Sequence, residues 1–284
     1  MAFSNYINEE ILDKILISTN NFILEKKKTK INQISIEDLQ KFIGASLFIG
    51  MMKGKNMDAR EFWSRKYGQS AVYDSISLDK FEQISACLRF DCRSSRNQSD
   101  KLAPIRDVFE KFIKNCQRFY CPSEQVTVDE QLVIFRGRCS FKMFIPSKPG
   151  RYGLKIWALC DSKNSYLYNA RVYLGKENGK KETNQGENIV KYLCQPIYKS
   201  ERNVTTDNFF TSLSLARFLL GQQLTIVGTV RKNKRFLTDE FQSNKGKKGE
   251  AKFLFNEKVT LVKYNPKKNR SVVLLSTLHH ERGT

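Results

Sequence analysis

The sequence has no long apolar run and no sorting signal at its start, and these absences exclude several classes of protein. No stretch of about 18 apolar residues occurs, so no membrane-spanning helix is predicted. The first residues, MAFSNYINEE, lack the basic-then-apolar order of a secretory signal. Ala2 rather than glycine follows Met1, and no cysteine lies near Thr284, so the common lipid anchors are not indicated. We therefore expect no association with a membrane.

The cysteines also lack the spacing that structural metal sites require. None of them forms the C-x-x-C pair that is typical of a zinc site, so no zinc module is predicted. Because the count is odd and the residues are scattered, we expect reduced thiols, several of them in the core, and a cytosolic or nuclear location. The seven are Cys87, Cys92, Cys116, Cys121, Cys139, Cys160 and Cys194.

Basic charge is what the chain has in excess. Its 284 residues include 49 Lys and Arg against 29 Asp and Glu, a net charge of +20. Proteins with such an excess usually meet a polyanion, nucleic acid first and an anionic membrane second. The run KKKTK at 26–30 is typical of a solvated loop, with a nuclear-import signal or a phosphate patch as the alternative.

Residues 1–122 carry helical patterns throughout. Apolar residues recur with helical spacing over 7–24, after Ser35, after Ser77 and, most regularly, over 105–120. Ser35 is followed by two acidic residues, which is typical of a helix start, and Pro122 closes the last helix. We predict an all-helical unit here and find no catalytic constellation in it.

The apolar period changes from helical to alternating at Glu124. The chain then predicts three successive antiparallel strands, a helix, a strand, a second helix and a fifth strand. This order is typical of a mixed α/β sheet with an RNase H-like fold. The expected ranges are 124–134, 153–160 and 166–174 for the first strands, 187–194 and 213–220 for the helices, and 202–209 and 224–230 for the later strands.

Two aspartates lie where such a sheet would bring them together. Asp129 has the opposite strand parity to Val126 and Val128, so it faces away from the buried row. Asp207 lies near the carboxyl end of a predicted strand, where open α/β sheets place ligands. Two carboxylates on neighbouring strands could hold Mg²⁺. The alternatives are a half-buried strand at Asp129 and a helix-capping role for Asp207.

A basic and aromatic ribbon follows the strand that carries Asp129. Cations beside an acidic group are expected to contact the phosphates of duplex DNA, while the alternative is a solvated basic loop. The cations that we expect at the DNA are Arg136, Arg138, Lys142, Lys148 and Arg151, and the aromatic residues between them are Phe141 and Phe144.

These stretches together resemble the piggyBac family of transposases. The resemblance rests on TVDEQLVIFRGRCSFKMFIPSKPGRYGLKIWALCDS, TTDNFFTS and LTIVGTVRKNKR, and it extends over the helical front part. It implies that Asp129 and Asp207 match the first two acids of a three-aspartate, two-metal site for DNA cleavage and strand transfer. It also implies a nuclear location and a helical front domain of the dimerisation and DNA-binding kind, which leaves a homodimer as an option.

The resemblance further divides the chain into four parts. They are the helical domain at 1–122, the first part of the RNase H-like domain at 123–232, a small β-rich insertion at 233–268, and the start of the last RNase H-like segment at 269–284.

The chain also departs from the family pattern. The third aspartate of the family lies on a helix beyond the apolar run at 271–278, and the sequence stops before it. Four other acids could substitute, but none lies in the matching motif, and Asp161 has the composition of a turn residue. We therefore expect a C-terminally truncated, inactive transposase domain, with a non-enzymatic DNA-binding protein as the alternative. The four acids are Asp239, Glu240, Glu257 and Glu281.

Overall fold

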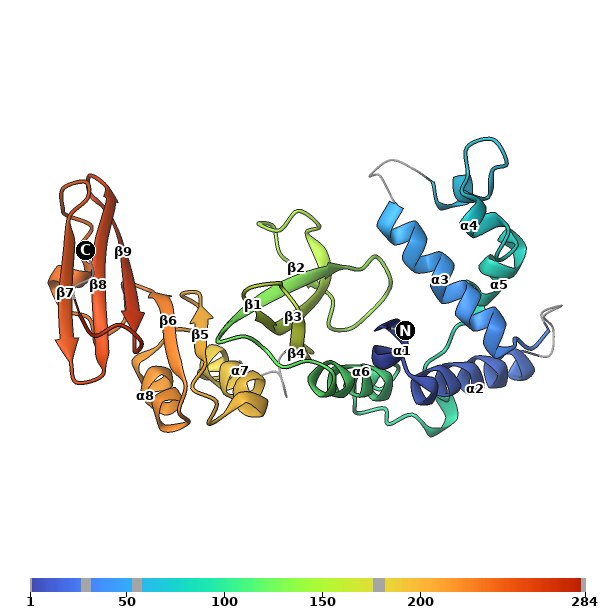
Figure 1. The fold of residues 1–284 in the computed structure, drawn as a ribbon, viewed down its shortest axis with the longest axis horizontal. Coiled ribbons are helices and arrows are strands. Elements are labelled where there is room, and N and C mark those ends of the chain that lie inside the picture. The colour runs from blue at the N-terminus through green and yellow to red at the C-terminus, as the bar shows by residue number, and fades with distance from the viewer. Residues whose placement is uncertain (1, 27–31, 53–57, 176–181, 282–284) are drawn as a thin grey trace. The chain divides into compact units, whose positions relative to one another are not determined.

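The computed structural model describes residues 2–26, 32–52, 58–175 and 182–281, and the chain divides into two compact units (Figure 1). The units are Met1–Asn115 and Cys116–Thr284, so the division falls inside helix α6 (Arg106–Arg118), whereas the sequence predicted a boundary at 122/123. Most of the KKKTK run lies outside the described residues.

The first unit is helical, as the sequence predicts. Two of its helix starts are set by serine side chains. The amide of Asp38 donates to Ser35 Oγ while the amide of Ser35 donates to Asp38 Oδ2, both at 3.1 Å, which is a reciprocal cap. Ser77 Oγ accepts from the amide of Lys80 at 3.3 Å. The elements are α1 (Ala2–Tyr6), α2 (Glu9–Glu25), α3 (Ile36–Met52), η1 (Ala59–Trp63), α4 (Ser70–Tyr73), α5 (Leu78–Cys87), η2 (Arg93–Ser95) and most of α6.

The second unit is built on one mixed sheet of nine strands. Its order is β2-β3-β1-β5-β6-β9-β8-β7, with β4 paired to β3. The β1–β5 and β5–β6 pairs are parallel and the others antiparallel. The strands are β1 (Gln125–Ile134), β2 (Met143–Phe144), β3 (Tyr152–Asp161), β4 (Leu167–Val172), β5 (Asn203–Thr206), β6 (Thr225–Val230), β7 (Ala251–Asn256), β8 (Val259–Lys267) and β9 (Arg270–Ser276). The predicted succession of three antiparallel strands, helix, strand, helix and strand is confirmed, apart from the short strand β2.

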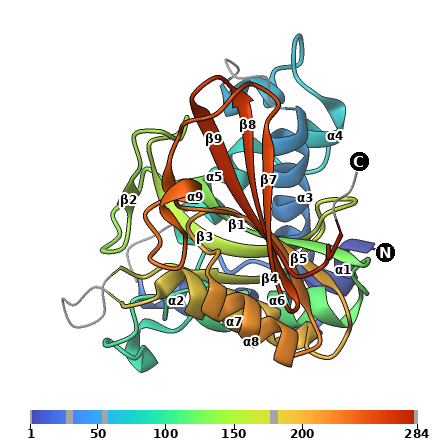
Figure 2. The ribbon, with the colours of Figure 1, turned by 90° about the vertical axis from the view of Figure 1, so that its left-hand side faces the viewer.

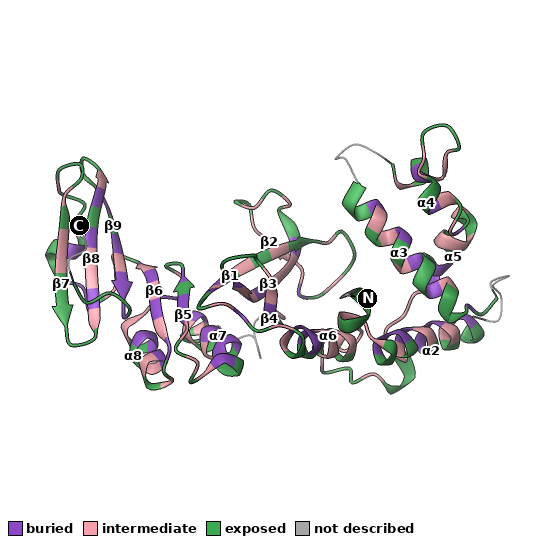
Figure 3. Cartoon of the chain, in the orientation of Figure 1, coloured by how far each residue is buried: buried purple, intermediate pink, exposed green. Residues whose placement is uncertain are grey.

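Helices α7 (Gln185–Cys194) and α8 (Leu213–Gly221) lie side by side on one face of this sheet (Figures 1 and 2). The core between them and the strands contains Val126 and Val128 of β1 and Leu193 and Leu219 of the helices, all at most 1% exposed. Burial alternates along β1, because successive side chains point to opposite faces of a strand (Figure 3).

The remaining elements of the second unit are two short helices. They are η3 (Gln195–Ile197) and α9 (Asp239–Gln242). Strands β7 and β8 lie in the range 233–268, and they join the sheet through β9, which pairs with β6. The sequence located these apolar runs but did not predict that β9 returns to pair with β6. The assignment of 233–268 as an insertion stays a prediction.

Candidate metal and nucleic-acid site

The parallel pairing of β1 with β5 sets the two predicted aspartates against each other. The paired register ends with Val128 opposite Thr206, so Asp129 and Asp207 are the next residues along the two neighbouring segments. Neighbouring strands lie about 4.8 Å apart, and residues at matching positions point to the same face. Both side chains are exposed. The structure therefore brings the two predicted acids together at the carboxyl edge of the sheet.

Each carboxylate uses one oxygen for a local hydrogen bond. Asp129 Oδ1 accepts from the amide of Glu130 at 2.7 Å, and Asp207 Oδ1 accepts from the amide of Phe209 at 2.8 Å. The second oxygen of each carboxylate accepts no hydrogen bond from the described residues. Asp207 is held in place by the turn that follows β5, which α7 approaches closely. A Cβ on Gly186 would lie 2.5 Å from the carbonyl oxygen of Phe209.

This donor set fits a hard divalent cation in part. Two exposed carboxylates with one free oxygen each match the oxygen ligands that Mg²⁺ prefers. Over the described ranges, no group of three or more His, Cys, Asp or Glu side chains lies close enough to hold a metal ion. Glu240 forms an ion pair with Lys252, and Asp239, Glu257 and Glu281 join no such group either. The site as described thus offers two protein ligands.

Two cations beside these acids were not predicted from the sequence. Lys155 Nζ of β3 lies 3.7 Å from the ring centroid of Trp157 and 5.2 Å from that of Phe209. Burial lowers the pKa of Lys155, and the charges of Glu130, Asp207 and Asp129 oppose that shift. The guanidinium of Arg231 also lies over the Phe209 ring, 5.6 Å from its centroid. The only sequence signals for these residues were the strand GLKIW and the run RKNKR.

Phe209 connects the aromatic stack to the acidic site. Its ring stacks on that of Trp157 with a centroid distance of 5.4 Å, and it follows Asp207 by two residues. Arg231 Nε also donates to Asn208 Oδ1 at 3.2 Å. Cations therefore lie at the edge of the sheet that carries the carboxylates.

The predicted basic ribbon follows β1 and surrounds β2. Arg136, Arg138 and Arg151 are exposed, while Lys142 and Lys148 are half-buried. Lys142 Nζ donates to the carbonyl of Gly137 at 3.0 Å. The other half-buried cation, Lys148, lies 3.6 Å from Glu130 Oε1, so part of its charge is already balanced. Exposed Arg136 and Arg138 form no ion pair with any described residue.

Asp161 is a structural acid rather than a metal ligand. It is 1% exposed and accepts from Tyr120 Oη (2.8 Å), the amide and hydroxyl of Ser123 (2.7 and 2.9 Å) and the amide of Lys163 (2.8 Å). Burial would raise its pKa, but these hydrogen bonds outweigh burial and hold the pKa well below its ordinary value. The bonds from Tyr120 and Ser123 fix the β3–β4 turn to the segment before β1, and the bond from Lys163 closes the turn itself, as expected for a turn residue.

Comparison with known proteins supplies the family. The family profile described as Transposase IS4 matches residues 2–283. A cryo-EM structure of a piggyBac transposase synaptic complex with hairpin DNA superposes with a TM-score of 0.91 and 35% identity, covering 99% of this chain and 61% of that chain. The chain belongs to the piggyBac-type transposases.

Curated relatives of the same type come from Homo sapiens. PiggyBac transposable element-derived protein 3 is 26% identical over 239 residues, which are 80% of this chain and 39% of that protein. PiggyBac transposable element-derived protein 2 is 23% identical over 274 residues, 92% of this chain and 45% of that protein. The chain thus spans less than half the length of these relatives.

The transposase family accounts for the architecture described above. The match to the transposase structure confirms the predicted fold class, a helical front part followed by an RNase H-like mixed sheet. The resemblance stated from the sequence is confirmed as well. No helix among the described residues is both long enough and apolar enough to cross a membrane.

Proposed function

We propose that this chain is a DNA-binding transposase domain that does not complete DNA cleavage, because the described residues bring only two acids to the site. The observation that carries the proposal is the juxtaposition of Asp129 and Asp207, the first on a strand that is followed by two exposed arginines with no ion pair among the described residues. Support comes from the net charge of +20 and from the relative solved as a complex with hairpin DNA.

Asp129 and Asp207 would hold the divalent cation, with Mg²⁺ as the expected ion. Such an ion, when bound, polarises phosphate oxygens and activates an attacking water or hydroxyl. The contribution of the chain itself is to hold two carboxylates in register, each with one oxygen that accepts no hydrogen bond from the described residues. Two protein ligands leave the ion dependent on water and substrate phosphate, so its position is poorly fixed. A misplacement of about 1 Å costs roughly a hundredfold in rate.

The ribbon supplies the DNA contacts in this proposal. Arg136, Arg138 and Arg151 are exposed and free to contact phosphates, and Lys142 and Lys148 contribute from half-buried positions. The domain limits 1–122, 123–232, 233–268 and 269–284 belong to the same proposal. So do a nuclear location, where duplex DNA is present, and a homodimer formed through the helical unit.

Salt dependence of DNA binding tests the interface. The affinity of the wild-type chain for duplex DNA should fall with salt by about 0.9 log units per log unit of salt for each phosphate contact. The Arg136→Ala/Arg138→Ala double variant should flatten that slope by about two units. Replacing Arg217 and Lys199, which are exposed in the same unit but outside the ribbon, should leave the slope unchanged. An unaltered slope in the double variant would remove the two arginines from the interface.

An excision assay with matched element ends tests the catalytic part. We expect no nicking with Mg²⁺ or with Mn²⁺. Nicking that is lost in Asp129→Ala and in Asp207→Ala would overturn the inactivity while supporting the site. It would also mean that a third acid, such as Asp239 or Glu257, completes the ligand set.

The alternative is a non-enzymatic DNA-binding protein derived from a transposase. The absence of a third acid beside Asp129 and Asp207 in the described ranges favours it. The two candidates differ in metal binding. A remnant of the catalytic site retains affinity for Mn²⁺ that depends on both aspartates, and a purely DNA-binding protein does not.

A further inference from the structure

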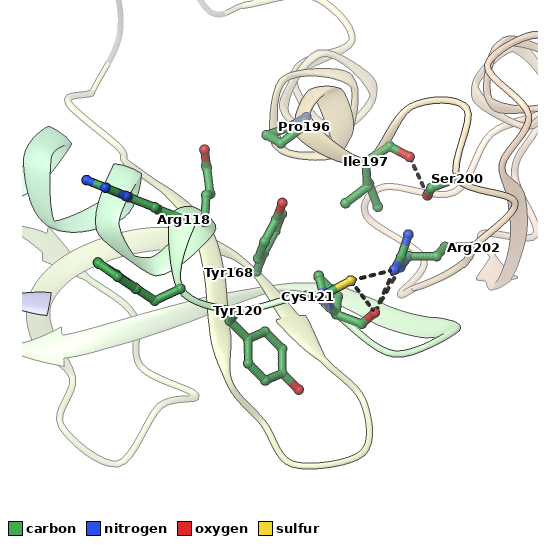
Figure 4. A pocket seen from close by; sticks show the side chains of 11 residues that line it. Arg118, Tyr120, Cys121, Tyr168, Pro196, Ile197, Ser200 and Arg202 are labelled. Carbon is green, nitrogen blue, oxygen red and sulfur yellow. Dashed lines mark hydrogen bonds between the residues drawn. The ribbon is translucent and has the colours of Figure 1, made fainter. Parts of the chain in front are cut away.

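A concave site lies at the amino end of the β1–β5 strand pair, opposite to the end that carries Asp129 and Asp207. A cavity of about 700 Å³ opens between the end of α6, the segment before β1, and the segment that joins η3 to β5 (Figure 4). Its polar lining includes Arg118, Cys121, Tyr168, Ser200 and Arg202. No Asp or Glu is among the described residues that line it, so two guanidinium groups dominate its charge. The size is that of a small-molecule site.

Cys121 is the exposed thiol of the chain. Of the seven cysteines, all in described ranges, Cys87, Cys116 and Cys194 are buried and the other three besides Cys121 are half-buried. Cys121 Sγ lies 3.3 Å from Arg202 Nη2 (Figure 4). A guanidinium donor therefore lies in direct contact with the exposed sulfur.

Tyr168 gives independent evidence of a ligand. Its side chain lines the cavity and is 8% exposed, yet no hydrogen bond from the described residues reaches its hydroxyl group. No buried side-chain polar atom of the described residues lacks a partner, so this hydroxyl group is open to the cavity and accessible to a ligand. The phenol lines the same cavity as Cys121 and Arg202. A donor without a partner therefore lies beside the thiol and the two cations, ready to bind an anionic or carbonyl group.

We propose that Cys121 is a thiol–disulfide exchange site for anionic low-molecular-weight disulfides, of which oxidised glutathione is the representative. The Cys121 thiolate attacks one sulfur of the disulfide, whose S–S bond breaks as the bond to Cys121 forms. The other half leaves as a thiolate and takes up the proton that Cys121 released. Cys121 is oxidised and the leaving half is reduced, so no further oxidant is needed. Arg118 and Arg202 bind the carboxylates of the attached half.

The modification acts on a contact that aligns β1 with β5. Arg202 donates from Nε and Nη2 to the carbonyl of Pro122 at 3.1 and 2.7 Å, and from Nε to that of Ser123 at 3.0 Å. These bonds tie the residue before β5 to the segment before β1. A bulky group on Cys121 competes with them for the guanidinium. The adduct therefore loosens the start of the strand pair whose far end carries Asp129 and Asp207.

Charge-selective labelling of the intact chain tests the proposal. The full-length protein is treated with oxidised glutathione, with neutral bis(2-hydroxyethyl) disulfide or with cationic cystamine, and each cysteine is quantified by peptide mass spectrometry. At Cys121 we expect oxidised glutathione to react about fivefold faster than the neutral reagent, relative to their rates with a free cysteine peptide. Cystamine should react more slowly than the neutral reagent. The selectivity should shrink as salt is raised.

Other thiols and one arginine provide the controls. Cys92, whose pKa is lowered by hydrogen bonds from Ser94, controls for thiolate reactivity without a cavity. Arg118→Gln should reduce the preference for the anionic reagent at Cys121, whereas Lys114→Gln, one turn earlier and also exposed, should not. Arg118 is exposed and donates no hydrogen bond to the residues that the structure describes, so its variant separates charge from stability. Equal rates for the three reagents at Cys121, or stronger labelling at Cys92 and Cys139 under the same conditions, would overturn the assignment.

Discussion

At the amino end of the β1–β5 strand pair, Asp161 of the adjacent β3 is 1% exposed and accepts four hydrogen bonds. At the carboxyl end, Asp129 and Asp207 are exposed, and each accepts one hydrogen bond from the described residues. The acid with every oxygen satisfied is part of the scaffold. The acids with free oxygens are available to a ligand. The acids at the two ends therefore differ in how many hydrogen bonds their carboxylate oxygens accept.

The largest effect on stability is expected for Asp161→Asn. The NH2 group of the asparagine would replace one carboxylate oxygen and face hydrogen-bond donors that it cannot accept from. We therefore expect the free energy of unfolding at pH 7 to fall by about 3 kcal/mol. Glu124→Gln, an exposed change at the same end, should alter it by less than about 0.5 kcal/mol. Chemical denaturation measures both. A small loss at Asp161 would remove the contrast between the two ends.

The pH dependence of the same variant sharpens that contrast. The folded-state pKa of Asp161 lies below its ordinary value of 3.8, so the ionised carboxylate stabilises the fold above that pH. This contribution declines as the pH falls below 3.8 toward the folded-state pKa. The stability difference between wild type and Asp161→Asn should therefore shrink on acidification below about pH 4. A difference that is independent of pH would contradict the depressed pKa.

Asp129→Asn and Asp207→Asn should show the opposite pattern. Each removes one of two charged ligands, so the affinity for Mn²⁺ should fall about tenfold, as measured by isothermal titration. The free energy of unfolding should change by less than about 0.5 kcal/mol, because both side chains are exposed. Asp13→Asn, an exposed acid of α2, serves as the matched control. Wild-type affinity in either site variant would show that the ion binds elsewhere.

Arg202→Lys tests the amino end from its cationic side. An ammonium cannot reproduce the guanidinium fork that reaches the carbonyls of Pro122 and Ser123, so we expect a loss of about 1 kcal/mol. Arg217→Lys on α8 is exposed and should be neutral. Because the hydrogen bonds of Arg202 hold the segments before β1 and β5 together, Arg202→Lys should also weaken metal binding slightly. Unchanged metal affinity would show that the two ends of the strand pair are independent.

The smallest effect is expected for Glu130→Gln at the carboxyl end. The change frees Lys148 from its ion pair, which is partly exposed and contributes less than about 0.5 kcal/mol to stability. Affinity for duplex DNA at low salt should rise about twofold as Lys148 becomes available to phosphate. Fluorescence anisotropy with Glu124→Gln as the control measures this. A drop in affinity would place Lys148 outside the DNA interface.

The local features of the site could be predicted from the sequence, whereas its long-range contacts could not. Strand parity places Asp129 on the exposed face, and the position of Asp207 after an apolar strand places it at the sheet edge. The caps at Ser35 and Ser77 are also predictable, because each serine hydroxyl accepts from an amide only three residues further along the chain.

The partners of Arg202 lie about eighty positions earlier in the chain, and no local pattern indicates them. The same holds for Lys155, whose contact with Phe209 depends on how β3 and the turn after β5 meet. The return of β9 to β6 is likewise a long-range choice that apolar runs alone do not determine. Local periodicity thus predicts elements and faces, while tertiary packing decides which charged groups meet.

The pairing register of β1 with β5 fixes the relative position of the two acids to within one residue. The paired residues run from Gln125 opposite Asn203 to Val128 opposite Thr206, and Asp129 and Asp207 are the residues that follow the last pair. Inserting one residue between Arg202 and Asp207 would turn the second carboxylate to the helix-covered face, because side chains alternate along a strand. Inserting two would restore the face but displace the carboxylate by about 6.6 Å along the strand. The two acids therefore meet only if the segment from Arg202 to Asp207 keeps its length as well as its composition.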